Sequence, residues 1–258
     1  MISRIYGLTL RYLFVYKRSF IRFGELLVFP LLDLLLWGFF ASYIKQHAPV
    51  GYLLGALILW DVFYRANQAA SLSILQEMWV GNTINLFVTP IRSIEIIIST
   101  SLFGIIRASI IFIFLSFCAY YLYSFNFFSY PINGALHIIN VFLFAWALGL
   151  VTASLILLFG EAAESLAWFI PLVVQPFCAV FYPLDSLPLY VKYFSMIFPI
   201  THDFESLRGI MAGQEMNYLF FYRSVCLNII WLILSGLFFV SCLKLVRERG
   251  YLTRGARS

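Results

Sequence analysis

The stretch QEMWVGNTINLFVTP, residues 76–90, is a polar, glutamate-bearing interruption in a chain that is otherwise dominated by apolar segments. A helix needs about 20 apolar residues to cross the hydrocarbon core of a bilayer. Segments of that length lie on both sides of the stretch, at Leu26–Tyr43, Gly51–Leu75, Glu95–Tyr123, Pro131–Phe159, Ala162–Tyr182 and Val225–Val246. The sequence therefore predicts an all-α membrane protein with six transmembrane helices.

The composition agrees with this interpretation and limits what else the chain can hold. Hydrophobic residues make up 62% and charged residues 11% of the sequence, whereas soluble domains carry about 25% charged residues. Crossings of about 20 residues each use nearly half of the 258 residues and leave only loops, an N-terminal arm and a short tail. We expect a single transmembrane domain over residues 1–258 and no nucleotide-binding or soluble catalytic domain. Any energy source should then reside in a separate partner.

Basic residues predict the orientation of the chain. Most of them stand in the N-terminal arm, in the C-terminal tail or beside the 76–90 stretch (Arg4, Arg11, Lys17, Arg18, Arg22, Arg92, Lys244, Arg247, Arg249, Arg254 and Arg257). Fewer lie on the other side of the predicted spans (Lys45, Lys192, Arg208 and Arg223). Because Lys and Arg near span ends are retained in the cytoplasm, we expect both termini to be cytoplasmic. This topology explains the net charge of +5, and we expect no nucleic-acid partner.

The first 24 residues form an amphipathic pattern. At 100° per residue, Arg4, Arg11, Arg18 and Arg22 fall on one face, and the opposite face is apolar. Such a helix lies in the headgroup plane of a membrane. We predict an interfacial helix over residues 1–24, either a simple anchor or a lever coupled to the first span.

Ionisable side chains within predicted spans are costly and are therefore functional candidates. Asp61 and Arg65 stand four residues apart and share a helical face, so we expect an intrahelical or intersubunit ion pair, or a polar wall on a transport path. Asp33 and Arg107 have no sequence-local partner and should face protein or water, or each other. Candidates for lining or gating a path also include two residues at a turn after Gly160, which could instead cap the fifth span: Glu161 and Glu164.

The fifth predicted span contains Pro171 and Pro176, which remove backbone hydrogen bonds. Breaks of this kind persist at membrane depth only where protein or a cavity satisfies the freed carbonyls. The following stretch, residues 183–224, mixes aromatic and charged side chains. We predict short re-entrant helices there, dipping into the outer leaflet.

Motifs for catalysis or metal binding are missing from the sequence. It has no G-x-x-x-x-G-K-[ST], no G-x-S-x-G and no paired histidines at metal-ligand spacing. We therefore predict no catalytic residues, no metal and no cofactor. The four cysteines fall in or beside apolar spans and are expected to be small core residues.

Two segments resemble ABC-2 type transporter permeases. Residues 75–90, followed by Ile94-Glu95, are similar to the family's E-x-x-x-G-T-x-x-x-L-x-x-T-P segment. The stretch Gln175–Pro188, with the later Phe198-Pro-Ile-Thr-His202 and Leu207-Arg208, is similar to the family's pattern after span five. Length, spans and the basic N-terminal helix also match, so the resemblance covers essentially the whole chain.

The resemblance implies a permease that forms a homodimer in the bacterial inner membrane. Two cytosolic ABC ATPase subunits would bind ATP and drive export of an amphipathic or lipid-linked substrate. Residues 76–94 would couple to the ATPase through Gln76, Glu77, Trp79 and Thr83. The path would run between protomers, past spans one, two and five, with the intramembrane charges and membrane lipid around it.

Two other classes stay open from the residues. A lipid-modifying membrane enzyme would need a polar cluster at a membrane face, and His202 with Asp203 and Glu205 is the only candidate. A non-transporting membrane scaffold would need no such cluster. A partner ATPase that turns over without moving solute would favour the scaffold.

Overall fold

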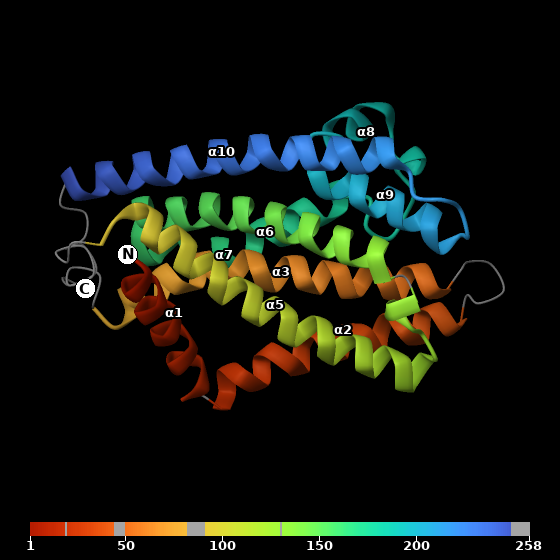
Figure 1. The fold of residues 1–258 in the computed structure, drawn as a ribbon, viewed down its shortest axis with the longest axis horizontal. Helices are drawn as coiled ribbons and strands as arrows, with labels where there is room; N and C mark the ends of the chain where they lie inside the picture. The colour runs from red at the N-terminus through yellow and green to blue at the C-terminus, as the bar shows by residue number, and fades with distance from the viewer. Residues whose placement is uncertain (19, 44–49, 82–90, 130, 249–258) are drawn as a thin grey trace.

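The computed structural model describes residues 1–18, 20–43, 50–81, 91–129 and 131–248 (Figure 1). All regular structure in these ranges is helical. The longer helices are α1 (Ile2–Lys17), α2 (Phe20–Tyr43), α3 (Val50–Trp79), α5 (Ser93–Tyr123), α6 (Pro131–Phe159), α7 (Leu166–Val174), α9 (Pro199–Met211) and α10 (Tyr218–Glu248). Shorter elements are η1 (Phe127–Ser129), η2 (Gly160–Ala163), η3 (Gln175–Phe177), η4 (Leu184–Ser186) and α8 (Leu189–Ser195).

The helices form an elongated bundle around α3 (Figure 1). Helix α3 packs against α6, α5 and α2, and α10 covers α6. The chain passes back and forth along the long axis as α2, α3, α5, α6, α7 and α10, each running opposite to the one before it (Figure 1). As a result, the N-terminus, the end of α3, the start of α5 and the end of α10 share one end of the bundle. We call this the α1 end and the opposite end the α9 end.

Four helices are long and apolar enough to cross a membrane. They are Phe23–Tyr43, Ser93–Tyr123, Gly134–Ala163 and Tyr218–Glu248, so the first, third, fourth and sixth predicted spans are confirmed as candidates. The second predicted span is a 30-residue helix, α3, whose polar side chains lower its hydropathy. The fifth is not one long helix: α7 has nine residues and gives way to the short η3, which begins at Gln175 and contains Pro176.

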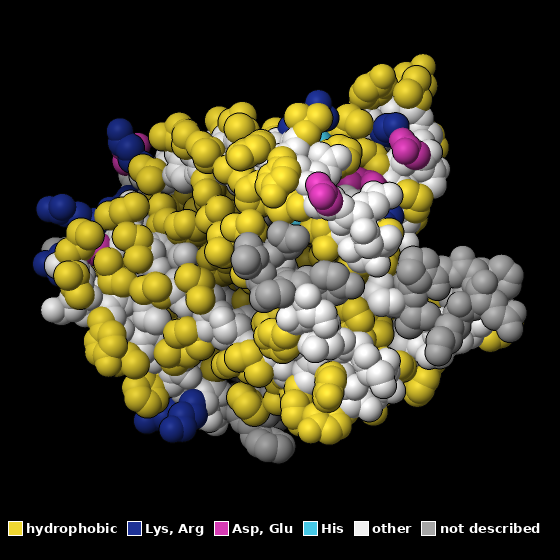
Figure 2. All heavy atoms as spheres, turned by 45° about the vertical axis from the view of Figure 1, so that its right-hand side comes forward, with side chains coloured by type: hydrophobic (Ala, Val, Ile, Leu, Met, Phe, Trp, Pro, Cys, Tyr) yellow, Lys and Arg dark blue, Asp and Glu magenta, His cyan; other side chains and the backbone are white. Residues whose placement is uncertain are grey.

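The surface between the two ends is mostly apolar. Figure 2 shows hydrophobic side chains over most of the visible face, with Lys and Arg gathered toward the α1 end. A mixed group of acidic and basic side chains lies near α8 and α9. This distribution is typical of a protein that exposes its middle to lipid and its ends to water.

Helix α1 is docked onto the α1 end by apolar and ionic contacts. Tyr12 is buried beside Phe103 of α5, with ring centroids 5.8 Å apart. Arg4 lies 3.7 Å from Glu95 at the start of α5. The helix ends at Lys17 and α2 begins at Phe20, so the expected helix over residues 1–24 is divided between two elements.

Helix α9 is embedded between α6 and α10 at the opposite end. Most of its residues are buried, including the charged Asp203. Asp203 accepts hydrogen bonds from Asn140 at 3.1 Å and from Ser224 at 2.6 Å, and it lies 2.8 Å from Nδ1 of His137. Because all four side chains are buried, this network fixes α9 to its two neighbours.

Candidate translocation groove

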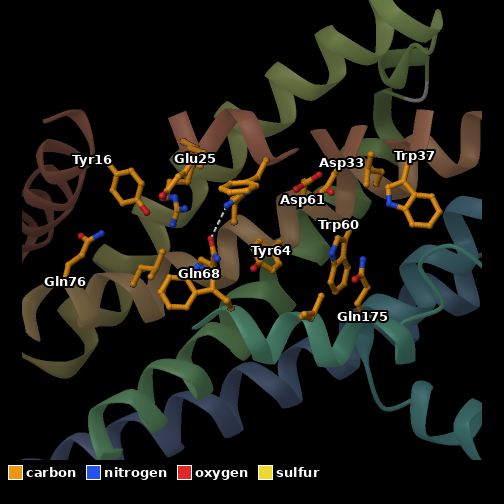
Figure 3. Close-up of a pocket in the computed structure, with 18 of the residues that line it drawn as sticks. Tyr16, Glu25, Asp33, Trp37, Trp60, Asp61, Tyr64, Gln68, Gln76 and Gln175 are labelled. Carbon is orange, nitrogen blue, oxygen red and sulfur yellow. Dashed lines mark hydrogen bonds between the residues drawn. The ribbon is translucent and has the colours of Figure 1, made fainter. Parts of the chain in front are cut away.

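A groove of about 600 Å³ runs along one side of the bundle between α2, α3 and α7 (Figure 3). Its lining follows a helical period on each of these helices. On α2 the lining residues are Glu25, Leu26, Phe29, Asp33 and Trp37, and on α3 they are Leu57, Trp60, Asp61, Tyr64, Arg65, Gln68, Leu72, Gln76 and Trp79. We call this cavity the α2–α3–α7 groove. It brings together Asp33, Asp61 and Arg65 from the predicted path.

Polar and aromatic side chains alternate along the groove. Figure 3 places Gln76 and Tyr16 at the α1 end, Gln68 and Tyr64 in the middle, and Asp61 and Asp33 one step farther. Trp37 closes the series toward the α9 end. A spacing of three or four residues along α3 puts these side chains on one face. The path residues predicted from the sequence were all charged, and Tyr64 and Gln68 were not among them, although the same spacing on α3 indicates both.

The intrahelical form of the expected ion pair between Asp61 and Arg65 is not present. Arg65 Nη1 instead lies 3.4 Å from Gln68 Oε1, a long contact one turn farther along α3. Oδ2 of Asp61 and Nε of Arg65 are buried and have no hydrogen-bond partner among the described residues. Both side chains line the groove with unused hydrogen-bonding groups, and a pair formed with a second copy stays a prediction.

Arg107 reaches the groove from α5 and is not paired with Asp33. The guanidinium lies over the ring of Tyr16 on α1, 4.7 Å from its centroid. Asp33 lies in the middle of the Phe23–Tyr43 candidate span and is exposed. A carboxylate cannot face hydrocarbon at that depth without a large free-energy penalty. Protein or water must therefore cover Asp33 in the membrane.

Two stacked aromatic rings line the groove toward the α9 end. Trp37 of α2 stacks on Phe181, with centroids 4.3 Å apart and planes 18° from parallel. Phe181 belongs to the nonhelical segment after η3, in which Ala179 adopts a positive φ of 51°. The segment is held by Arg208 of α9, whose Nη2 donates to the carbonyls of Ala179 at 3.0 Å and Tyr182 at 2.7 Å.

Tyr52 of α3 completes the clamp around Arg208. Its hydroxyl accepts from Arg208 Nη2 at 2.6 Å and donates to the carbonyl of Val180 at 2.5 Å. Glu205 pairs with Arg208 and also accepts from the backbone N–H of Leu184. Proline breaks at membrane depth require such partners for the freed carbonyls. Sequence reasoning assigned no role to Tyr52, because nothing in its neighbourhood marks it among the many tyrosines.

The predicted ATPase-coupling residues lie in different environments. Gln76 is buried in the groove wall and Glu77 is buried against α1, where its Oε2 accepts from Arg11 Nη2 at 2.7 Å. Trp79 is 41% exposed at the last position of α3. Thr83 lies outside the described residues. Gln76, Glu77 and Trp79 thus belong to the end of a long helix rather than to a separate short one.

Glu161 and Glu164 lie at the α1 end, away from the groove lining. Glu161 is exposed in η2, and Glu164 is half-buried just after it. Helix α7 begins without a side-chain cap. The expected capping of this helix by the two carboxylates is not seen, and a part in gating stays a prediction.

A comparison with known families bears on what the chain is. Residues 11–212 match the ABC-2 type transporter family. The chain belongs to this family. The match confirms the resemblance stated from the sequence. Chains of this family are membrane components of transporters and are not themselves catalytic. No curated protein matched the chain significantly.

The lipid-modifying enzyme hypothesis depended on His202, Asp203 and Glu205. These three side chains do not meet at one site. His202 Nε2 lies 3.1 Å from the carbonyl of Met196, and burial lowers the pKa of this histidine. Asp203 faces His137, while Glu205 faces Arg208. The three side chains leave α9 in different directions, so this geometry does not support acid–base chemistry by the group. The described residues contain no group of three or more metal-binding side chains.

Proposed function

We propose that this ABC-2 chain is the permease subunit of an ATP-driven exporter, and that it acts as a homodimer with two cytosolic ATPase subunits. The α2–α3–α7 groove forms half of the transport path in this proposal. The second half comes from the same groove of a second copy. ATP is bound and hydrolysed only by the partner subunits.

The exposed carboxylate of Asp33 is the main observation that supports a dimer. It lies at mid-span in a groove that a single chain leaves uncovered along one side. The α2 span and the α10 span are each 28% buried within the chain, compared with 67% of the α6 span, and of the two exposed spans α2 is the one that carries Asp33. A second copy placed over α2 would remove Asp33 from lipid and leave it facing a polar path. It would also convert two open grooves into one enclosed space.

The distribution of charge supports the orientation. Arg4, Arg11, Lys17 and Arg18 on or next to α1 share an end of the bundle with Lys244 and Arg247 of α10. The positive-inside rule assigns that end to the cytoplasm. Both termini then lie on the cytoplasmic side, as the predicted topology requires. Helices α8 and α9 become the re-entrant helices of the outer leaflet.

The α1 end also offers a docking surface for the ATPase. Trp79 and Val80 at the end of α3 are exposed there, whereas Glu77 ties α3 to α1. A force applied at Trp79 would act directly on α3, which carries one wall of the groove. We therefore assign Trp79 to the ATPase contact and Glu77 to the rigidity of the lever that includes α1.

The substrate class follows from the lining of the groove. Trp60, Trp168 and Phe29 provide wide apolar surfaces beside the charged residues. A cavity with both kinds of wall suits an amphipathic or lipid-linked compound. Export then means moving this compound from the α1 end toward the α9 end.

The proposal is tested by reconstituting the chain in lipid with candidate ATPase subunits from the genome that encodes it. We expect a stable complex whose ATP hydrolysis differs from that of the free ATPase. Trp79→Ala should weaken the complex, whereas Tyr190→Ala, which removes an 88% exposed aromatic on α8 at the other end, should not. A well-folded chain that binds none of the ATPases would contradict the proposal.

A further inference from the structure

Arg107 is a deeply buried cation for which the described residues provide no carboxylate. Its side chain is 3% exposed near the middle of α5, and Nε and Nη1 have no hydrogen-bond partner there. Its close neighbours are the faces of Tyr16 and Phe103, at 4.7 and 5.7 Å. Aromatic faces attract a cation but do not replace the hydrogen bonds that it loses on leaving water. Arg107 therefore has no counter-ion within the described part of the chain.

Arg65 is a second cation on the wall of the same groove. It is 8% exposed, its Nε has no partner among the described residues, and its single hydrogen bond is the 3.4 Å contact with Gln68. The carboxylates that face the groove are Glu25, Asp33 and Asp61. Neither arginine forms an ion pair with any of these three in the part of the chain that the structure describes. Two guanidinium groups thus share one cavity with unused donors.

We propose that Arg107 and Arg65 form an anion site that binds the phosphate head of an amphipathic ligand carried by the transporter. A guanidinium presents its donors as a planar fork that fits phosphate oxygens, and paired arginines suit a doubly charged group. Tyr16, beside Arg107, and Gln68, beside Arg65, line the same groove and can add donors. The inference rests on the proposed function and names the substrate class for its path.

The remaining walls account for the apolar part of the ligand. Leu72 lines the groove from α3, and Trp168 and Leu172 line it from α7. Of the three carboxylates, Figure 3 places Glu25 between Tyr16 and Gln68, beside the proposed anion position, and Asp61 and Asp33 one step farther toward the α9 end. The two farther carboxylates would repel the phosphate and form a barrier beyond the two arginines. Moving the phosphate past the two carboxylates is the step that ATP hydrolysis would have to drive.

The binding test uses the full chain in phosphatidylcholine nanodiscs without any ATPase, so that it does not depend on ATPase docking. Dodecyl phosphate is the probe, and the fluorescence of the groove tryptophans reports its binding. Dodecyl maltoside and dodecyl trimethylammonium serve as neutral and cationic probes of equal chain length. We expect saturable binding that is at least tenfold tighter for dodecyl phosphate. Arg107→Gln should weaken this binding about tenfold or more, Arg107→Lys should weaken it less, and Arg223→Gln, an exposed arginine on α10, should leave it unchanged.

Thermal unfolding separates this site from a structural ion pair. Because Nε and Nη1 of Arg107 have no hydrogen-bond partner among the described residues, Arg107→Gln should keep or raise the melting temperature of the ligand-free chain. Dodecyl phosphate should raise the melting temperature of the wild type but not of the variant. If a carboxylate of a second copy neutralised Arg107, the substitution would lower the dimer fraction and dodecyl phosphate would show no preference over the neutral probe. That result, or equal phosphate binding by Arg107→Gln and the wild type, would overturn the proposal.

A last comparison identifies the source of the phosphate. Nanodiscs that contain phosphatidic acid offer the same head on a membrane lipid. Competition with dodecyl phosphate would assign the site to a bilayer lipid, and lack of competition would assign it to a separately delivered amphiphile. Both results support an anion site at Arg107 and Arg65. These binding results do not depend on ATPase docking, so the anion site and the proposed exporter function can fail independently.

Discussion

Arg11 on α1 contacts Glu77 near the end of α3, with 2.7 Å between Nη2 and Oε2. The Glu77 carboxylate is buried, while the Arg11 side chain is partly exposed. Because the buried carboxylate needs a cationic partner, this ion pair stabilises the contact between α1 and α3. This contact links the N-terminal helix to the helix that forms one wall of the groove. It supports the lever interpretation of α1 over a simple anchor.

Removing Arg11 should therefore loosen α1. Arg11→Gln leaves Glu77 buried with one fewer donor, and we expect a loss of about 1–2 kcal/mol after allowing for the exposure of the arginine. Faster hydrogen exchange in residues 2–17 would locate the change. The control is Lys244→Gln, which breaks an exposed pair with Glu248 at 3.8 Å and should change stability by less than about 0.5 kcal/mol. Equal effects of the two substitutions would argue against a coupled α1.

Asp203 should be needed for the placement of α9. In Asp203→Asn, the new amide group meets a donor from His137, Asn140 or Ser224, and at least one buried hydrogen bond is lost. We expect destabilisation of about 2–4 kcal/mol by thermal unfolding in nanodiscs. Glu215→Gln, at an exposed site just beyond α9, should be neutral. An unchanged melting temperature for Asp203→Asn would show that the network does not hold the helix.

Arg208 should not be replaceable by lysine. Lysine cannot contact Tyr52 and the carbonyls of Ala179 and Tyr182 at once, because it lacks the planar fork. Arg208→Lys should free the segment that carries Phe181 and change the emission of Trp37, its stacking partner. Arg223→Lys serves as the control on an exposed site. Wild-type emission and transport in Arg208→Lys would refute a role for the clamp in closing the groove.

Gly149 of α6 should be needed for the close packing of α6 on α3. A Cβ at Gly149 would lie 2.6 Å from the carbonyl oxygen of Asn67, so the two helices would have to separate. We expect Gly149→Ala to destabilise the protein by at least about 2 kcal/mol. Gly236→Ala in α10 meets nothing within 4 Å and should stabilise by about 0.5–1 kcal/mol. Opposite signs in the two melting temperatures would confirm the close packing of α3 on α6, and matching signs would contradict it.

The sequence predicted the elements whose signal is local. Long apolar runs such as Glu95–Tyr123 indicated spans, and the helix α5 covers that run. Pro176 coincides with the interruption of the fifth predicted span, whereas Pro171 lies inside α7 and does not end it. The family motifs predicted an ABC-2 chain, which the match over residues 11–212 confirmed.

The contacts between distant segments could not be predicted in the same way. Arg65 was paired with Asp61 because they share a helical face, but side-chain direction on α3 turns Arg65 toward Gln68 instead. Glu77 was assigned to an exposed surface because the sequence does not show that α1 folds back onto α3. Arg107 gained Tyr16 as a neighbour through the same docking of α1. The misses at Glu77 and Arg107 depend on the placement of one helix against another, which hydropathy and spacing do not encode.

The central claim is that two copies of this ABC-2 chain join their grooves and bind two ATPase subunits. Native mass spectrometry of the tagged chain, coexpressed with its ATPase and released from nanodiscs, measures this composition directly. Our account predicts a main species with two copies of each subunit, and loss of the ATPase but not of the permease dimer in Trp79→Ala. A monomeric chain, or a dimer that never carries an ATPase, would contradict it.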